Sequence, residues 1–194
     1  MTTNYDDLLD RAFAETRRPF DLVIHPTDRK ENEASVLWWK HGAEEPEILA
    51  PNKLHIDLAK TTVIYKMHGS VDRLLHKWHS YVVTEDDYVD FISRMMSESA
   101  VPALFMRHFR TRHFLFLGYS LRDWNFRVVL KNLETVLPLP AEGAVHEEGE
   151  LRSWAIQYQP SPLEQELWEA RHVNIYDMDV NEFTRSLRQA VDEA

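Results

Sequence analysis

The sequence predicts an α/β fold, in which helices cover both faces of a mainly parallel β-sheet. Strand-like and helix-like segments alternate from about residue 62 to the C-terminus, as they do where βαβ crossovers build a parallel sheet. The segment FLFLG at 114–118 is an almost continuous apolar run that ends in glycine, the pattern of a strand buried on both faces. The 194 residues, of which 44% are apolar, suffice for one sizeable core, so we expect a single domain over 1–194.

The N-terminal part of the chain is expected to form a helix followed by a small insertion. Thr3-Asn4-Tyr5-Asp6 is a helix-start signal, apolar residues follow it at helical spacing, and Pro19 ends the helix. The segments FDLVIH at 20–25 and SVLWWK at 35–40 are strand-like, and the polar sequence after them is typical of a loop. We therefore expect a small β-hairpin or loop insertion over about 20–60.

The later elements follow from apolar runs and helix-start signals. Strands are expected at 62–67, 80–83, 114–118, 154–158 and 172–176. Helices are expected to begin near Thr84, Pro102, Ser120, Ser161 and Asp179. The acidic stretch 138–150 is rich in proline and glycine and is expected to be a loop.

Composition excludes several classes of protein. The formal net charge is −10, so we expect no binding to nucleic acid or to anionic membranes. The absence of cysteine excludes disulfides, zinc–thiolate sites, iron–sulfur clusters and cysteine nucleophiles. His76 and His79 are spaced i,i+3 but lack the rest of a zinc motif, so no metal is expected.

No apolar run approaches the roughly 20 residues of a membrane span, and the N-terminus lacks a secretory signal. We therefore expect a cytoplasmic protein.

Three short segments occupy the positions where ligands of a parallel sheet bind, beyond the carboxyl ends of strands. Two of them are His68-Gly69-Ser70 and Gly118-Tyr119-Ser120. Thr3-Asn4-Tyr5-Asp6 joins them if a strand precedes residue 1. The 5 glycines are too scattered to form a GxGxxG or Walker loop, so no complete phosphate-binding loop is encoded.

These segments resemble three motifs of the sirtuin superfamily. The matches are TTNYDDL (2–8) to TQNxD, KMHGS (66–70) to the HG motif, and GYSL (118–121) to GTSL. The longer strings GYSLRDWNFR (118–127) and VVTEDDY (82–88) resemble the sirtuin-like branch found in bacterial defence proteins. The resemblance covers about residues 1–135 and implies a Rossmann-like three-layer fold, with NAD as substrate and a role in antiphage defence.

The resemblance also implies roles for individual residues. His68 would be the catalytic histidine, and Asn4 and Asp6 would contact the nicotinamide ribose and the water or nicotinamide site of NAD. The expected NAD-binding residues are Thr3, Asn4, Asp6, Gly118, Tyr119 and Ser120.

The chemistry of these residue types is compatible with cleavage of NAD. Breaking the nicotinamide–ribose bond passes through an oxocarbenium-like cation, which a nearby carboxylate stabilises. A histidine with an ordinary pKa near 6.5 accepts a proton at neutral pH. Structural alternatives stay open for three positions. His68 is also compatible with a polar residue at a strand end, Ser120 with a helix N-cap, and Asp6 with a first-turn acid that complements the helix dipole.

Two departures from the family pattern shape the expected function. The four-cysteine zinc module of the deacetylases is absent between His68 and Gly118, which favours cleavage of NAD with water as acceptor. The family's first strand and its GAGxS-type loop should precede TQNxD, so the sheet is expected to be incomplete at its N-terminal side. We expect that Met1 is a misplaced start, that the chain is a fragment, or that a partner subunit or second copy completes the sheet.

The expected activity of the intact form, in which the missing N-terminal half is supplied, is therefore NAD⁺ hydrolysis to nicotinamide and ADP-ribose, whereas the chain as given is expected to bind NAD poorly. The first alternative is a non-catalytic, truncated NAD-binding or assembly module, since the sheet edge left by missing strands favours association. The second is an NAD-dependent protein deacylase.

Overall fold

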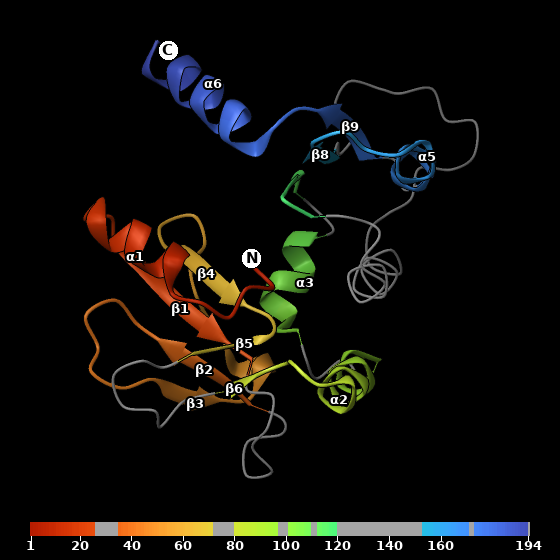
Figure 1. The fold of residues 1–194 in the computed structure, drawn as a ribbon. Coiled ribbons are helices and arrows are strands. Elements are labelled where there is room, and N and C mark those ends of the chain that lie inside the picture. Colours follow the sequence, from red (N-terminus) through yellow and green to blue (C-terminus); the bar gives the residue numbers. More distant parts are fainter. Residues whose placement is uncertain are drawn as a thin grey trace. The chain divides into compact units, whose positions relative to one another are not determined.

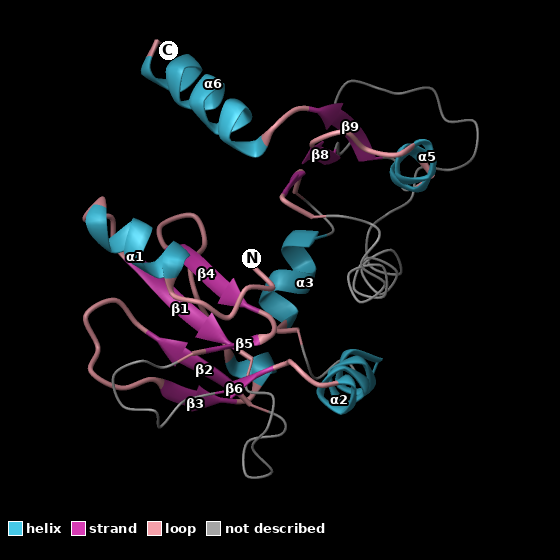
Figure 2. Cartoon of the chain, in the orientation of Figure 1, coloured by secondary structure: helices cyan, strands magenta, loops and turns pink. Residues whose placement is uncertain are grey.

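The computed structural model describes residues 1–25, 35–71, 80–96, 101–109, 112–119, 153–170 and 173–193. The chain divides into two compact units, Met1–Met106 and Arg107–Ala194, and each is described here by itself (Figure 1). Helices and strands occur in both units, which confirms the expected α/β class (Figure 2).

The first unit is built around a mixed four-stranded sheet of order β3-β2-β1-β4. Strands β1 and β4 are parallel, whereas β1–β2 and β2–β3 are antiparallel. A separate antiparallel pair joins β5 to β6. The elements of the first unit are α1 (Leu8–Glu15), β1 (Phe20–Ile24), β2 (Val36–Trp39), β3 (Glu47–Leu49), a 3-10 helix (Pro51–Lys53), β4 (Thr62–Lys66), β5 (Gly69–Ser70), β6 (Ser80–Tyr81) and α2 (Glu85–Met96). Helix α3 (Ala103–Phe109) begins in the first unit and ends in the second.

The second unit contains a parallel three-stranded sheet of order β7-β8-β9. Helix α5 connects β8 to β9 and thus forms one of the expected βαβ units. The elements are β7 (Phe114–Leu117), β8 (Ser153–Gln157), α5 (Pro162–Glu169), β9 (Val173–Asp177) and α6 (Val180–Asp192).

Each sheet has its own apolar core. In the first unit, β1 and β4 bury Val23, Ile24 and Ile64, and the Tyr65 ring stacks on Phe105 with centroids 4.7 Å apart. In the second unit, Trp168 of α5 is fully buried. These side chains pack helices α3 and α5 against the faces of the sheets. The ends of the strands lie outside this packing and can contribute to sites.

Local capping explains where several helices begin. At α2, Thr84 Oγ1 accepts a hydrogen bond from the Asp87 amide, and Asp87 Oδ2 accepts from the Thr84 and Val83 amides. These backbone donors hold the pKa of Asp87 below its usual value. At α6, the Asp179 carboxylate accepts from the amides of Asn181 and Glu182. The predicted helix starts at Thr84 and Asp179 are confirmed.

Replacing Ser161 by alanine is expected to destabilise the protein by about 1 kcal/mol. Ser161 and Glu164 form a capping box at the start of α5, in which each side chain accepts a hydrogen bond from the other's backbone N–H. Urea unfolding followed by far-UV circular dichroism measures the loss. The matched control is Ser186→Ala in the exposed middle of α6, which should cost nothing, and equal effects of the two variants would contradict the capping role.

Three sequence-based expectations differ from the structure. The first helix begins at Leu8 instead of near Thr3, because residues 2–5 pair with β4 and the chain after it. The loop expected over 41–60 contains β3 and a 3-10 helix. Strand β7 is not buried on both faces, since Leu115 and Leu117 are 44% and 38% exposed while Phe116 points into the core.

Several expectations lie outside the described residues. These are the helix starting at Ser120, the acidic loop at 138–150, and the His76 and His79 pair. Within the described part of the chain, no helix combines the length and the apolar character needed to cross a membrane.

Candidate functional site

The N-terminal segment lies along the edge of β4. Thr2 forms a parallel bridge with Lys66, in which the Thr2 amide donates to the Tyr65 carbonyl (2.9 Å) and the Met67 amide donates to the Thr2 carbonyl (3.0 Å). Further on, the Val71 amide donates to the Tyr5 carbonyl at 2.8 Å. The two segments predicted to form one site, around Asn4 and around His68, therefore run side by side.

The side chains of this N-terminal segment have different environments. The Asn4 side chain is exposed, and the backbone N–H of Asn4 donates to Thr2 Oγ1 at 3.0 Å. Asp6 is half-buried, and its Oδ1 accepts from the Leu8 amide at 3.0 Å, at the start of α1. Asp6 therefore takes part in starting the helix, which was one of the two roles that its sequence position allowed.

His68 lies in the turn between β4 and β5 and is 6% exposed. Its ring meets the rings of Phe91 and Tyr88 edge-on, with centroids 4.8 Å and 5.6 Å away and interplanar angles of 85°. Both aromatic residues belong to α2. His68 Nε2 is buried in this arrangement.

A second histidine lies at the end of the strand next to β4. His25 follows β1, is 1% exposed, and donates its amide hydrogen to the Lys66 carbonyl at 3.0 Å. Its ring contacts Phe91 with centroids 5.9 Å apart. Two imidazoles thus border one aromatic side chain at the carboxyl ends of the parallel strands β1 and β4.

Lys66 is the most deeply buried charged side chain near the turn, with no exposed surface. Its ammonium donates to the Asp10 carboxylate (2.6 Å), the Asp6 carbonyl (2.6 Å) and the Ser70 hydroxyl (3.1 Å). Burial raises the pKa of Asp10, and the hydrogen bond from Lys66 acts in the opposite direction. Sequence analysis did not single out Lys66, because two of its three partners, Asp6 and Asp10, lie far away in the chain.

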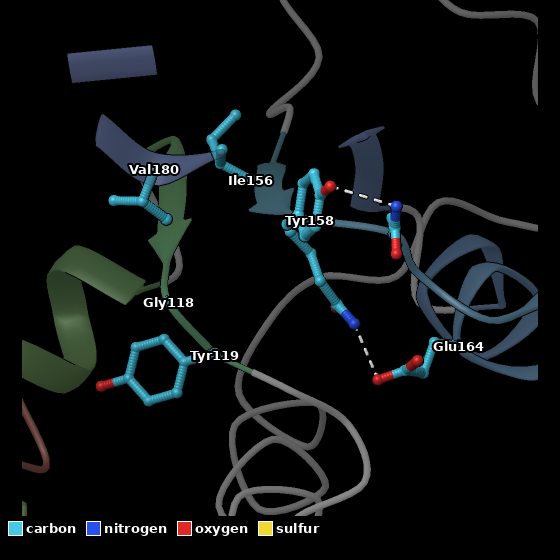
Figure 3. Close-up of a pocket in the computed structure, with 8 residues that line it drawn as sticks. Gly118, Tyr119, Ile156, Tyr158, Glu164 and Val180 are labelled. Carbon is cyan, nitrogen blue, oxygen red and sulfur yellow. Dashed lines mark hydrogen bonds between the residues drawn. The ribbon is translucent and has the colours of Figure 1, made fainter. Parts of the chain in front are cut away.

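The second unit has a pocket at the carboxyl ends of its parallel strands. The volume is about 310 Å³. Figure 3 shows Gly118 and Tyr119 after β7 on one side of the pocket, with Tyr158 and Glu164 on the other. Among the described residues, the lining consists of Gly118, Tyr119, Ile156, Gln157, Tyr158, Gln159, Glu164 and Val180. Gly118 has a φ of 71°, a conformation that disfavours any residue with a side chain.

A hydrogen-bond network fixes the amide of Gln157 at this pocket. Gln157 Nε2 donates to Glu164 Oε1 at 2.7 Å, and its Oε1 accepts from the Trp168 indole at 3.3 Å. The other Glu164 oxygen accepts from the backbone and hydroxyl of Ser161. Sequence analysis missed Gln157 and Glu164 as pocket residues, although Gln157 ends a strand and the strand-end rule could have found it.

The predicted site residues divide between the two units. Asn4, Asp6, Thr3 and His68 belong to the first unit, and the structure brings their backbone segments together. Gly118 and Tyr119 belong to the second unit and line its pocket. Ser120 lies outside the described residues. Among the residues that the structure describes, no group of three or more acidic or histidine side chains is arranged to hold a metal ion.

Comparison with known proteins identifies relatives of the chain. The sequence profile of the SIR2-like domain family matches residues 1–176. A curated protein of Enterococcus faecium named NAD(+) hydrolase ThsA is 29% identical over 140 residues, which make up 70% of this chain. The matched region is 22% of the length of that relative, so the chain corresponds to a part of it. No solved structure matches the chain.

Proposed function

The chain belongs to the SIR2-like domain family, and from this premise we propose that it is an NAD⁺ hydrolase that releases nicotinamide and ADP-ribose. One observation carries the proposal: the segment bearing Asn4 and Asp6 is hydrogen-bonded along the strand and turn that bear His68. The activity named for the Enterococcus relative supports it. A role in antiphage defence is part of the same proposal.

The proposed reaction uses the residues at the His68 turn. The bond between the ribose C1′ and the nicotinamide nitrogen breaks, and a water oxygen forms a new bond to C1′. The cleavage leaves positive charge on the ribose, which the acidic Asp6 at the same edge stabilises. His68 accepts a proton from a ribose hydroxyl or from the water, and Asn4 orients that water. The proposed step requires the buried Nε2 of His68 to become accessible to the ribose.

We propose that the pocket of the second unit binds the adenosine half of NAD⁺. Its described lining offers amide groups and tyrosine hydroxyls, which suit the hydroxyls of a ribose and the edge of a purine. The backbone at Gly118 and Tyr119 follows a parallel strand, which is the usual location of a nucleotide in such sheets.

We further propose that residues 1–194 form one domain with a Rossmann-like three-layer fold.

Incubation of the protein with NAD⁺ is expected to release nicotinamide and ADP-ribose in equal amounts, because water is the acceptor. Liquid chromatography measures both products over time. The chain is assayed alone and together with any in-frame sequence encoded upstream of Met1, since the family's glycine-rich loop precedes the TQNxD motif.

The outcomes separate the candidate functions. Binding of ADP-ribose without turnover supports a non-catalytic NAD-binding module. NAD-dependent removal of acetyl groups from an acetyl-lysine peptide supports a deacylase. Absence of both product release and ADP-ribose binding contradicts any role for NAD.

A further inference from the structure

Lys66 connects three segments of the chain at the proposed catalytic turn. It is the last residue of β4, its ammonium reaches Asp6 and Asp10 near the N-terminus, and it also reaches Ser70 of β5. The contacts to Asp6 and Asp10 span 60 and 56 positions of sequence. His68 lies between Lys66 and Ser70, so the residue proposed as the base lies within the shortest of these connections.

The contacts satisfy a buried ammonium completely. An ammonium has three donors, and here one donates to a carboxylate, one to a backbone carbonyl and one to a hydroxyl. A charge without exposed surface is stable only when it is paired and hydrogen-bonded. Replacing such a pair by apolar groups often leaves stability unchanged, so stability alone gives little reason for this arrangement.

The location of the acceptors indicates what the ammonium does. The Asp6 carbonyl belongs to the segment that carries Asn4, and this segment has no regular secondary structure of its own beyond the bridge at Thr2. Lys66 thus connects this segment with the His68 turn, in addition to the backbone hydrogen bonds of Thr2 and Tyr5 and the contact of the Tyr5 ring with Tyr81. Preorganisation of this kind is what a reaction between a bound water and a ribose requires.

We propose that Lys66 is a positioning residue, which holds the Asn4–Asp6 segment against the His68 turn so that both act on one ribose. The claim that Lys66 supports catalysis rests on the proposed function. The claim that its ammonium orders the N-terminal segment does not depend on that function.

The first test removes the ion pair without leaving an unpaired buried charge, in the double variant Lys66→Met, Asp10→Asn. Amide hydrogen exchange of Met67 and Val71, which donate to the N-terminal segment, is expected to become at least about tenfold faster. Exchange at Val23 in the middle of β1 should stay unchanged. In an active preparation, kcat should fall by about 100-fold while KM for NAD⁺ changes little.

The matched control is Lys60→Met. Lys60 is also a lysine paired with an aspartate, Asp57, but its side chain is 83% exposed. This substitution should leave the exchange rates and the kinetic constants as they are.

The second test restores the ammonium chemically. The chain contains no cysteine, so Lys66→Cys introduces a single thiol. Alkylating that thiol with 2-bromoethylamine in the unfolded chain, followed by refolding, rebuilds a side chain of similar length that ends in an ammonium. The alkylated protein should recover slow exchange at Met67 and Val71, and the unalkylated protein should not.

The results separate this proposal from the proposed function. Uniformly faster exchange, including Val23, or no gain on alkylation, overturns the positioning role even if wild-type protein hydrolyses NAD⁺. If exchange becomes faster at Met67 and Val71 alone in the double variant, while the wild-type protein never cleaves NAD⁺, the ordering role is supported and the hydrolase is rejected.

Discussion

Replacing His68 by glutamine is expected to reduce the rate of NAD⁺ cleavage by about 10²–10⁴-fold, the usual contribution of a general base. Glutamine retains a polar side chain of similar size in the space beside Phe91 and Tyr88. It does not accept a proton at neutral pH, so the proposed step is lost while the turn keeps its packing. Nicotinamide release under saturating NAD⁺ measures the effect.

His25→Gln is the matched control for this substitution. His25 is buried to a similar degree, follows a strand of the same sheet, and also contacts Phe91. The control should lower stability as the His68 variant does, yet keep most of the NAD⁺ cleavage. If both variants lose activity only in proportion to their unfolded fraction, His68 has a structural role and not a catalytic one.

Replacing Trp168 by alanine is expected to destabilise the protein by about 3–5 kcal/mol. The side chain is fully buried in α5, its ring lies 5.2 Å from that of Phe116, and its indole donates to Gln157. The substitution therefore leaves a large cavity and an amide with a missing partner at the pocket. The midpoint of urea unfolding, followed by far-UV circular dichroism, measures the loss.

The control on the same helix is Leu163→Ala. Leu163 is 65% exposed, so its truncation should change stability by less than about 0.5 kcal/mol. A Trp168 variant as stable as this control would show that α5 does not anchor the parallel sheet. Reduced ADP-ribose binding by a Trp168 variant that is still folded would tie the Gln157 network to the pocket.

Elements with strong local signals were predictable from the sequence. The helix starts at Thr84, Ser161 and Asp179 are each stabilised by side chains within three residues of the start, so the sequence contains all of the interacting groups. Strands β1, β4 and β8 likewise follow from apolar runs.

Elements set by distant contacts were not predictable in the same way. Thr3-Asn4-Tyr5-Asp6 has the residue types of a helix start. However, residues 2–5 form hydrogen bonds with the β4 and β5 region instead, so the helix begins only at Leu8. The same reason explains why Lys66 was missed, because the burial of a lysine is decided by partners almost 60 positions away. Gln157 was missed because strand-end residues were considered only where a motif drew attention to them.

The placement of Thr2 beside β4 affects how the protein should be produced. β4 is an edge strand of the four-stranded sheet, and Thr2 pairs with it in parallel orientation at Lys66. A fusion peptide added before Met1 would continue in line with this pairing along β4, which is the last strand in the described order of this sheet, and would compete there for backbone groups. An affinity tag is therefore best attached after α6.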